Sequence, residues 1–456
     1  MKDIFPYRRN ARTLCKLLLG LTFAVLVAPA AGVGAVMKAG VARADITPPP
    51  GVHMMGYANS SIPTGTLDPL YARVLVLEAG DRRLAWVDLD LSRPFGPASL
   101  DWLRNAVAQA TGIHWMIVDS IHTHAGPMIR PEYPSGPPPW EESALRKIVQ
   151  AVEQAQGSAV PVRLGTAYGR AYIGYNRRRV NADGSVTMIW NNAAKAPTSP
   201  VDPTVGVLRI DKMDGTPLAI LVNYACHPVT FGPGNTRYSA DFPGVMCKLV
   251  RQAFGGQPVC FYLQGASGDI NVYDASTPIK DGAVQKRDWA GEQLGTEVVR
   301  VAKGIHTRAA PDASLDYSDD SMTFGLRWNP DKFRQAMLKD FGPNYLPPIQ
   351  TRMQLPVTTL LIDKRIAIMG MPGEPFVNFQ MEWRTRCPVQ DCFFLGYTNG
   401  YFGYRPTIKA AAQGGYGAGN ETTWVQTGAG EAMVVRALVE VNEMLGRLQD
   451  VPRTNW

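Results

Sequence analysis

Two histidines one residue apart stand out in the segment SIHTHAGP, because the whole chain contains six. Residues at i and i+2 of an extended segment project from the same face, so His122 and His124 can point at one object. A metal ion is one such object. The alternative is a pair of loop histidines that hydrogen-bond to nearby carbonyl groups.

Three apolar segments each end at a residue that can bind a metal. WMIVDSIH ends at His122, ILVNYACH at His227 and IAIMGMPGE at Glu374. In open α/β sheets the functional groups gather at strand ends and in the loops that follow them. Two histidine nitrogens and a carboxylate oxygen, with one position left open, are the ligands of a catalytic zinc ion. The pattern predicts such a site, although each residue alone could be structural.

The elements that must position these residues alternate between strands and helices. The strand pair ARVLVLEAG and RLAWVDLDL is joined across GDRR, and apolar residues recur with helical spacing in residues 99–112, 142–157, 243–256 and 431–448. No repeat or low-complexity linker divides the chain. We therefore predict an α/β fold in which residues 36–456 form a single large mixed-sheet catalytic domain with its metal site at strand ends.

The first 35 residues have the composition of an export signal. MKDIFPYRRNARTLCK carries five basic residues and one acid, LLLGLTFAVLVAPAA is apolar, and small residues follow. We expect residues 1–35 to be a signal peptide and the mature protein to be periplasmic or secreted. The leader carries much of the formal charge of +7, and no basic stripe follows it, so nucleic acid is not an expected partner.

The cysteines do not suggest a thiolate metal site. The chain has six cysteines and no CxxC pair. Cys15 falls in the leader, and in an oxidising compartment Cys387 and Cys392 could pair. A zinc site in this chain must therefore use histidine and oxygen ligands.

Nine short motifs follow one another along the chain after the leader: ADITPP, MMGYA, HTHAGP, GYNR, ACHPV, QGASGD, MPGEP, TNGYFGYRPT and GGYGAG. In this order they resemble the neutral and alkaline ceramidases, in the N-terminal catalytic domain of that family. The resemblance implies a zinc-dependent amidohydrolase that cleaves the N-acyl amide of ceramide, or of a related N-acyl lipid, to a fatty acid and a sphingoid base.

The resemblance also implies roles for individual residues. It implies one zinc ion per chain with four ligands: His122, His227, Glu374 and Tyr404, the second tyrosine of YFGY. His124 then lies beside the metal and contacts the substrate or transfers a proton. Arg177 of GYNR contacts the polar head of the substrate. Tyr416, twelve residues after Tyr404, donates a hydrogen bond to the developing oxyanion.

The sequence departs from the family pattern in two places. Ceramidases of this family usually carry a further C-terminal β-sandwich domain, which we do not expect here. In addition, Asn271 and Val272 stand where Ser-Pro is common in the family. Both departures bear on ceramide as the substrate and leave the zinc chemistry intact. The proline-rich segment PMIRPEYPSGPPPW either forms an apolar rim for lipid or caps the fold.

Three other functions remain open. The zinc site could act on a non-lipid amide or a small peptide-like molecule. Asp88 and Asp119 could build a two-metal phosphoester hydrolase, although Asp241 is expected instead to anchor the loop behind His227. The chain could also be a catalytically silent binding protein. The expected partner is a small molecule or a lipid, with transient contact to a membrane surface and an oligomeric state that the sequence does not predict.

Overall fold

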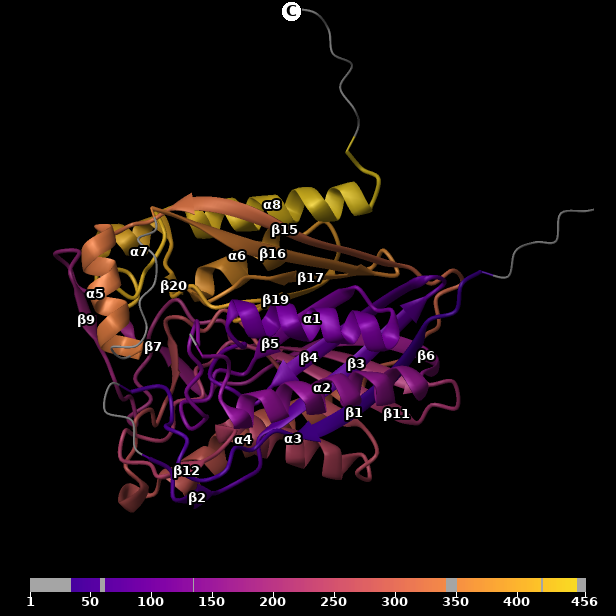
Figure 1. Ribbon diagram of the computed structural model, residues 1–456, viewed down its shortest axis with the longest axis horizontal. Coiled ribbons are helices and arrows are strands. Elements are labelled where there is room, and N and C mark those ends of the chain that lie inside the picture. Colours follow the sequence, from indigo (N-terminus) through magenta and orange to yellow (C-terminus); the bar gives the residue numbers. More distant parts are fainter. Residues whose placement is uncertain (1–33, 58–61, 134, 342–350, 420, 449–456) are drawn as a thin grey trace, which may run out of the picture. The chain divides into compact units, whose positions relative to one another are not determined.

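An eight-stranded mixed sheet carries most of the N-terminal half of the chain (Figure 1). The computed structural model describes residues 34–57, 62–133, 135–341, 351–419 and 421–448, so residues 1–33 of the expected signal peptide lie outside the described residues. The strands, in spatial order, are β13 (Val259–Gln264), β11 (Pro217–Tyr224), β10 (Thr204–Lys212), β6 (Val160–Arg170), β1 (Lys38–Asp45), β3 (Tyr71–Ala79), β4 (Arg82–Leu89) and β5 (Trp115–Ser120).

The outer strand pairs of this sheet, β13–β11 and β4–β5, are parallel, and the inner pairs are antiparallel. Parallel neighbours need a crossover connection, which is commonly a helix. Here α1 (Pro97–Thr111) connects β4 to β5, and α3 (Asp241–Ala253) connects β11 to β13. The predicted pairing of β3 with β4 across the GDRR turn is confirmed.

A second sheet of four strands packs against the first. Its order is β15 (Leu315–Gly325), β16 (Arg352–Ile362), β17 (Ile366–Gly370) and β19 (Asp391–Leu395). Buried side chains from both sheets meet between them, among them Leu221 and Phe261 from the first and Leu360 and Phe393 from the second. The prediction of a large mixed sheet is confirmed, and the second, separate sheet is a feature that the sequence analysis did not predict.

Helices cover the outer faces of both sheets (Figure 1). Together with α1 and α3, α2 (Pro139–Gly157) and α4 (Ala283–Lys303) pack on the eight-stranded sheet, and α6 (Val377–Arg386) and α8 (Ala429–Met444) pack on the four-stranded sheet. The result is a helix–sheet–sheet–helix order of layers. Within α1, the predicted apolar face of Leu100, Leu103 and Val107 is buried.

Short elements complete the described part of the chain. They are β2 (Gly65–Thr66), β7 (Gly174–Asn176), β8 (Arg178–Val180), β9 (Val186–Met188), β12 (Arg237–Tyr238), β14 (Ile270–Val272), β18 (Glu374–Pro375), β20 (Tyr404–Arg405), the 3-10 helix η1 (Ile279–Asp281), α5 (Pro330–Phe341) and α7 (Ile408–Gln413). Within the described ranges, no helix combines the length and apolar character needed to cross a bilayer. Cys387 and Cys392 are free thiols, so the pairing that the sequence left open is not formed.

The eight-stranded sheet curls until its two edge strands meet. β13 lies in contact with β5, and the side chain of Gln264 donates from Nε2 to the carbonyl oxygen of Ile121 over 2.9 Å. The right-handed twist between neighbouring strands accumulates over a wide sheet. Because of this curl, the loop after β5 and the loop after β11 lie beside each other, although many strands separate them in the sheet.

Candidate metal centre and active site

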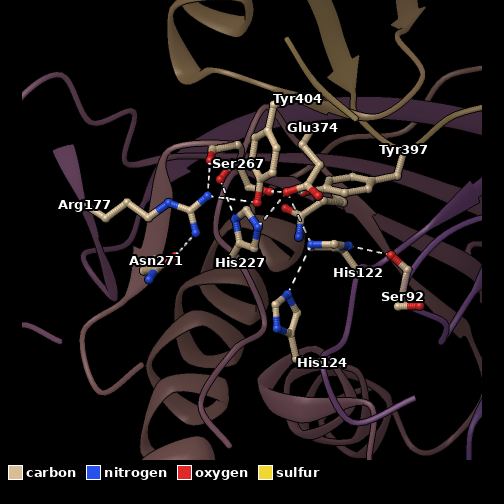
Figure 2. Close-up of polar contacts among 12 residues, drawn as sticks. Ser92, His122, His124, Arg177, His227, Ser267, Asn271, Glu374, Tyr397 and Tyr404 are labelled. Atoms are coloured by element: carbon tan, nitrogen blue, oxygen red, sulfur yellow. Dashed lines mark hydrogen bonds and ion pairs between the residues drawn. The ribbon is translucent and has the colours of Figure 1, made fainter. Parts of the chain in front are cut away.

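His122 and His227 come from these two loops and face each other (Figure 2). The two rings lie 4.7 Å apart between centroids. Nδ1 of His122 lies 2.5 Å from the carbonyl oxygen of Ser92, and Nδ1 of His227 lies 2.5 Å from the carbonyl oxygen of Ser267. A carbonyl can only accept, so Nδ1 carries the hydrogen in both rings. Each Nε2 therefore keeps its lone pair for a metal ion.

Glu374 closes the third side of this space. Its Oε2 lies 3.0 Å from Nε2 of His227 and 3.5 Å from Nε2 of His122. Burial alone would raise the pKa of Glu374, but its contacts with His122, His227 and Tyr401 outweigh burial and hold that pKa well below its usual range. An ionised carboxylate thus lies against the Nε2 atoms of two imidazole rings, where a proton or a divalent cation can balance its charge. Two histidine nitrogens and a carboxylate oxygen are ligands of the kind that zinc prefers.

His124 lies beside this set. Its Nε2 is 3.3 Å from Nε2 of His122, and ring nitrogens of His122, His124 and His227 lie within 4.8 Å of one another. Nδ1 of His124 is buried and has no hydrogen-bond partner among the described residues. Burial lowers the pKa of His122 to about 3 and holds that of His124 well below its usual value. Both rings are neutral at pH 7, which is the form that binds a metal or accepts a proton.

Tyr404 is tied directly to Glu374 by the backbone. The two residues face each other as partners in the parallel bridge of β18 with β20. Side chains at paired positions project from the same face. The phenol oxygen of Tyr404 accepts a hydrogen bond of 3.0 Å from Nη2 of Arg177 (Figure 2). Two residues far apart in sequence, and implied by the resemblance as ligands, are therefore immediate neighbours.

Arg177 is fixed by several polar contacts beside Tyr404. Its Nη2 donates to the carbonyl oxygen of Gly268 over 2.6 Å, and its Nη1 donates to Oδ1 of Asn271 over 3.2 Å. Asn271 is the residue at which the sequence departs from the family pattern. The resemblance assigns Arg177 to the polar head of the substrate. The departure from the family pattern therefore lies at a residue that hydrogen-bonds to Arg177.

Aromatic rings surround the guanidinium of Arg177. Its central carbon lies 5.5 Å from the ring centroid of Tyr404, 5.2 Å from that of Tyr416 and 5.7 Å from that of Trp190. Tyr416 packs edge-on against Tyr404, and Trp190 packs edge-on against Tyr416. The structure thus places Tyr416 beside Arg177 and Tyr404. Trp190 is 49% exposed and forms the outer edge of this group.

Sequence reasoning missed two tyrosines that support the centre. Tyr401 donates to Oε1 of Glu374 over 2.5 Å, and the ring of Tyr397 stacks on His122 with centroids 4.2 Å apart. Tyr397 lies 3.4 Å from the other oxygen of Glu374. The concentration of tyrosines in YTNGYFGYRPT, shortly after an apolar strand, was the available signal. Together they fix both oxygens of the carboxylate.

The backbone at the centre adopts an uncommon conformation. His122 has φ 69°, Tyr397 has φ 51° and Asn399 has φ 54°. Residues other than glycine rarely enter this region, and they concentrate at functional sites where the surroundings hold them. The expectation that His122 and His124 point together is met, but the reason differs. His122 lies after the strand, in a left-handed turn, and not in an extended segment.

The alternative two-metal site lies in the core instead. We define the buried carboxylate cluster as Asp88, Asp90 and Asp119, which are fully buried. Oδ1 of Asp88 and Oδ2 of Asp119 have no hydrogen-bond partner among the described residues. Asp119 accepts from Nε1 of Trp86 over 2.8 Å, and Asp88 lies 3.6 Å from Arg73. A substrate cannot reach these carboxylates, so the geometry disfavours phosphoester hydrolysis there.

Asp241 has the position that was expected of it. Its two carboxylate oxygens accept hydrogen bonds from the backbone nitrogen and the hydroxyl group of Thr230, over 2.9 and 2.7 Å. Thr230 follows His227 in the same loop. Asp241 therefore anchors the segment that carries one of the two facing histidines.

The comparisons with known proteins agree with this architecture. A family model described as neutral/alkaline non-lysosomal ceramidase, N-terminal, matches residues 37–270. The structure is similar to a neutral ceramidase from Pseudomonas aeruginosa, with a TM-score of 0.71 and 18% identity, covering 91% of this chain and 76% of that chain. A second structure, titled as a ceramidase complexed with C2, gives a TM-score of 0.69 with the same identity and coverage. No curated protein sequence matches.

The family match covers only some of the site residues, and the structural match supports the fold alone. The matched residues 37–270 include His122, His124, Arg177 and His227, and Glu374 lies beyond them. At 18% identity the structural likeness shows the fold alone. The family match covers more than half of the chain, and on this ground the chain belongs to the neutral/alkaline non-lysosomal ceramidase family.

Proposed function

We propose that this protein is an exported, zinc-dependent amidohydrolase that cleaves the N-acyl amide bond of ceramide or a related N-acyl lipid to a fatty acid and a sphingoid base. One observation carries the proposal. Nε2 of His122 and Nε2 of His227, from two separate loops, lie 3.5 and 3.0 Å from Oε2 of Glu374 in β18. Membership of a ceramidase family supports an amide as the bond that is cleaved.

These three atoms would hold the zinc ion, with the phenol of Tyr404 as the fourth ligand. Nitrogen and oxygen ligands of this kind suit zinc, and a catalytic site keeps one position open for substrate or water. When bound, zinc polarises the amide carbonyl group and makes a water molecule more acidic. The neutral ring of His122 and the ionised carboxylate of Glu374 have the protonation state that such an ion needs.

The residues around the centre handle the substrate. Arg177, held by Gly268 and Asn271, orients the polar head of the substrate beside Tyr404. Tyr416 donates a hydrogen bond to the carbonyl oxygen as negative charge develops on it. Removal of one donor of this type commonly costs about 10² to 10³ in rate.

His124 moves the proton. The attacking water gives a proton to Nε2 of His124, the C–N bond breaks, and the same proton passes to the leaving amine nitrogen. The neutral ring that burial imposes is ready to accept this proton. The acyl carbon gains the water oxygen, and the products are a carboxylic acid and a free amine.

Metal content and turnover, measured together, test the proposal. Wild-type protein should contain about one zinc ion per chain and hydrolyse short-chain ceramide, and His122→Ala should lose both properties. His306→Ala, at an exposed position away from the centre, is the matched control. Metal retained in His122→Ala with loss of activity would move His122 to a substrate role and contradict this ligand set.

A second candidate keeps the centre and changes the substrate. Asn271 contacts Arg177, so the residue that departs from the family pattern also changes the contact to the polar head. A non-lipid amide or a small peptide-like molecule is the alternative substrate. A panel of N-acyl lipids and small amides separates the two, because turnover of a small amide without turnover of any lipid would exclude ceramide.

A further inference from the structure

A cavity of about 630 Å³ lies next to the candidate metal centre. It opens where the start of α1, the proline-rich segment around Arg130, the strand β16 and the loop after β19 meet. Tyr401 belongs to both places. Its side chain lines the cavity, and its phenol oxygen donates to Oε1 of Glu374 over 2.5 Å. One side chain thus connects the cavity wall to the carboxylate at the metal centre.

The walls of the cavity carry an excess of positive charge. Its charged side chains are Arg93, Arg104, Arg130, Arg352, Asp101, Glu132 and Asp319. Arg104 lies 3.8 Å from Asp101 and 3.9 Å from Asp319, so these three side chains together carry a charge of −1 and the whole lining has an excess of one positive charge. In the described part of the chain, neither Arg130 nor Arg352 forms an ion pair with a carboxylate. Glu132 is exposed and is the remaining acid.

Arg93 extends this charge toward the metal centre. It is 8% exposed, and its guanidinium carbon lies 3.7 Å above the ring of Tyr401. The helix α1 begins at the same wall with Gly96, without a capping side chain and without an acidic residue in its first turn. Its positive dipole end adds to the field of the arginines.

The same cavity also offers apolar surface. Phe95, Ile129, Met353, Phe402 and Trp424 line it beside the arginines. Arginine forks bind phosphate, sulfate and carboxylate groups through charge-assisted hydrogen bonds. A cavity that combines both features suits an anionic group attached to an apolar body. Neutral ceramide, whose head carries hydroxyl groups, would bring no charge to Arg130 and Arg352, which line the cavity.

We propose that this cavity binds the anionic group of an N-acylated lipid while the amide of that lipid lies at the metal centre. The inference rests on the proposed function and narrows its substrate class to N-acyl lipids that bear a phosphate, sulfate or carboxylate. Arg130 and Arg352 bind the anion directly. Tyr401 separates the anion from Glu374, so that the two negative groups do not meet.

A matched pair of substrates tests the proposal. Short-chain ceramide and its 1-phosphate differ by one anionic group. Wild-type protein should hydrolyse the phosphate with the higher kcat/KM. The double variant Arg130→Gln/Arg352→Gln should lose about 10- to 100-fold in kcat/KM for the phosphate, because it removes the two side chains that form charge-assisted hydrogen bonds with the anion. Its kcat/KM for ceramide should stay within about threefold.

The control variant is Arg83→Gln, which removes an arginine from the distant pairing of β3 with β4, where Arg83 lies 3.7 Å from Glu78. It should leave both substrates unaffected. Equal losses on the two substrates in the double variant, or no loss on either, would overturn the proposal. Inorganic phosphate that competes as strongly as the lipid phosphate would assign the cavity to a free anion and overturn the lipid assignment.

Direct binding separates this inference from the proposed function. Octyl phosphate should bind wild-type protein in calorimetry and should bind the double variant at least about tenfold more weakly. Binding that depends on these arginines, without hydrolysis of any N-acyl lipid by metal-loaded protein, would refute the hydrolase and keep the anion site. Hydrolysis of ceramide without such binding would refute the anion site alone.

Discussion

The candidate metal centre and the buried carboxylate cluster are both groups of titratable side chains in the interior, and they are built in different ways. In the cluster, Asp90 accepts two hydrogen bonds from Arg73, and Asp119 accepts one from Trp86. In the candidate metal centre, Nε2 of His122 and Nε2 of His227 lie 3.5 and 3.0 Å from Oε2 of Glu374. The first group contains a counter-charge in Arg73, whereas the second brings together nitrogen and oxygen atoms that suit a divalent cation.

This difference helps to distinguish a buried polar cluster that stabilises the fold from one that binds a ligand. In the cluster, hydrogen bonds from Arg73 and Trp86 hold the carboxylates in the core, although Oδ1 of Asp88 and Oδ2 of Asp119 have no hydrogen-bond partner among the described residues. In the candidate metal centre, two imidazole nitrogens and a carboxylate oxygen converge on one space and can hold a cation there. The two regions should therefore respond differently to mutation, the first through stability and the second through metal binding and rate.

The strongest expected effect comes from His227→Ala. The substitution removes a nitrogen from the donor set, so we expect loss of zinc and a fall in activity of more than about 10³, beyond the effect of losing a single hydrogen-bond donor. Metal analysis and ceramide hydrolysis measure both. Full metal content in this variant would show that His227 is not a zinc ligand.

Tyr416→Phe should have the next largest effect. The ring stays against Tyr404 and the hydroxyl group is lost, so we expect kcat to fall about 10² to 10³ with little change in metal content. Steady-state kinetics on ceramide provide the measurement. An unchanged kcat would mean that another group stabilises the oxyanion.

Tyr401→Phe should reduce zinc affinity about 10- to 100-fold, because it removes the hydrogen bond that orients Glu374. Competition with a chelator measures the affinity without reference to turnover. Tyr317→Phe is the control, since its hydroxyl group donates to the carbonyl oxygen of Met116 in another part of the fold. Equal affinities for Tyr401→Phe and wild type would deny Tyr401 a role in positioning.

The smallest effect is expected in the carboxylate cluster. Burial raises the pKa of Asp119 to about 7 from an ordinary 3.8, so the folded state holds this proton more tightly than the unfolded state. The free energy of unfolding should therefore fall as pH rises between those values, by about 1 kcal/mol per pH unit from this group. Asp119→Asn should remove this decline and leave zinc content unchanged.

Denaturant unfolding at pH 5 and pH 8 measures this slope for wild type and variant. A variant that keeps the wild-type slope would show that Asp119 is not the group responsible. A variant that loses zinc would show that the cluster and the metal centre are coupled. Either result would weaken the contrast between the two regions.

Local patterns in the sequence predicted the elements that rely on neighbouring residues. The apolar face of Leu100, Leu103 and Val107 and the pairing of β3 with β4 depend on short-range spacing, and both are confirmed. The long helix α4 was not predicted, because its residues Gly291 and Gly295 interrupt an otherwise helical pattern. Those glycines lie against α3 at Val245 and Leu249, which only the folded structure reveals.

The sequence patterns did not predict how distant strands are arranged in space. The curl that brings β5 to β13 depends on the summed twist of many strands, and no local pattern records it. The separate four-stranded sheet and the roles of Tyr397 and Tyr401 depend on the same tertiary packing. The strand-end pattern supplied the candidate residues His122, His227 and Glu374, the resemblance to a family added Tyr404, and the fold explains how such distant positions become neighbours.

The bridge between β18 and β20 makes Glu374 and Tyr404 a single mechanical unit. Deleting one residue from the connecting loops would bring Arg405 or Gly403 opposite Glu374 in place of the phenol. Loop length is then constrained as strictly as side-chain identity. An insertion far from the candidate catalytic residues can therefore abolish activity although every sequence motif is unchanged.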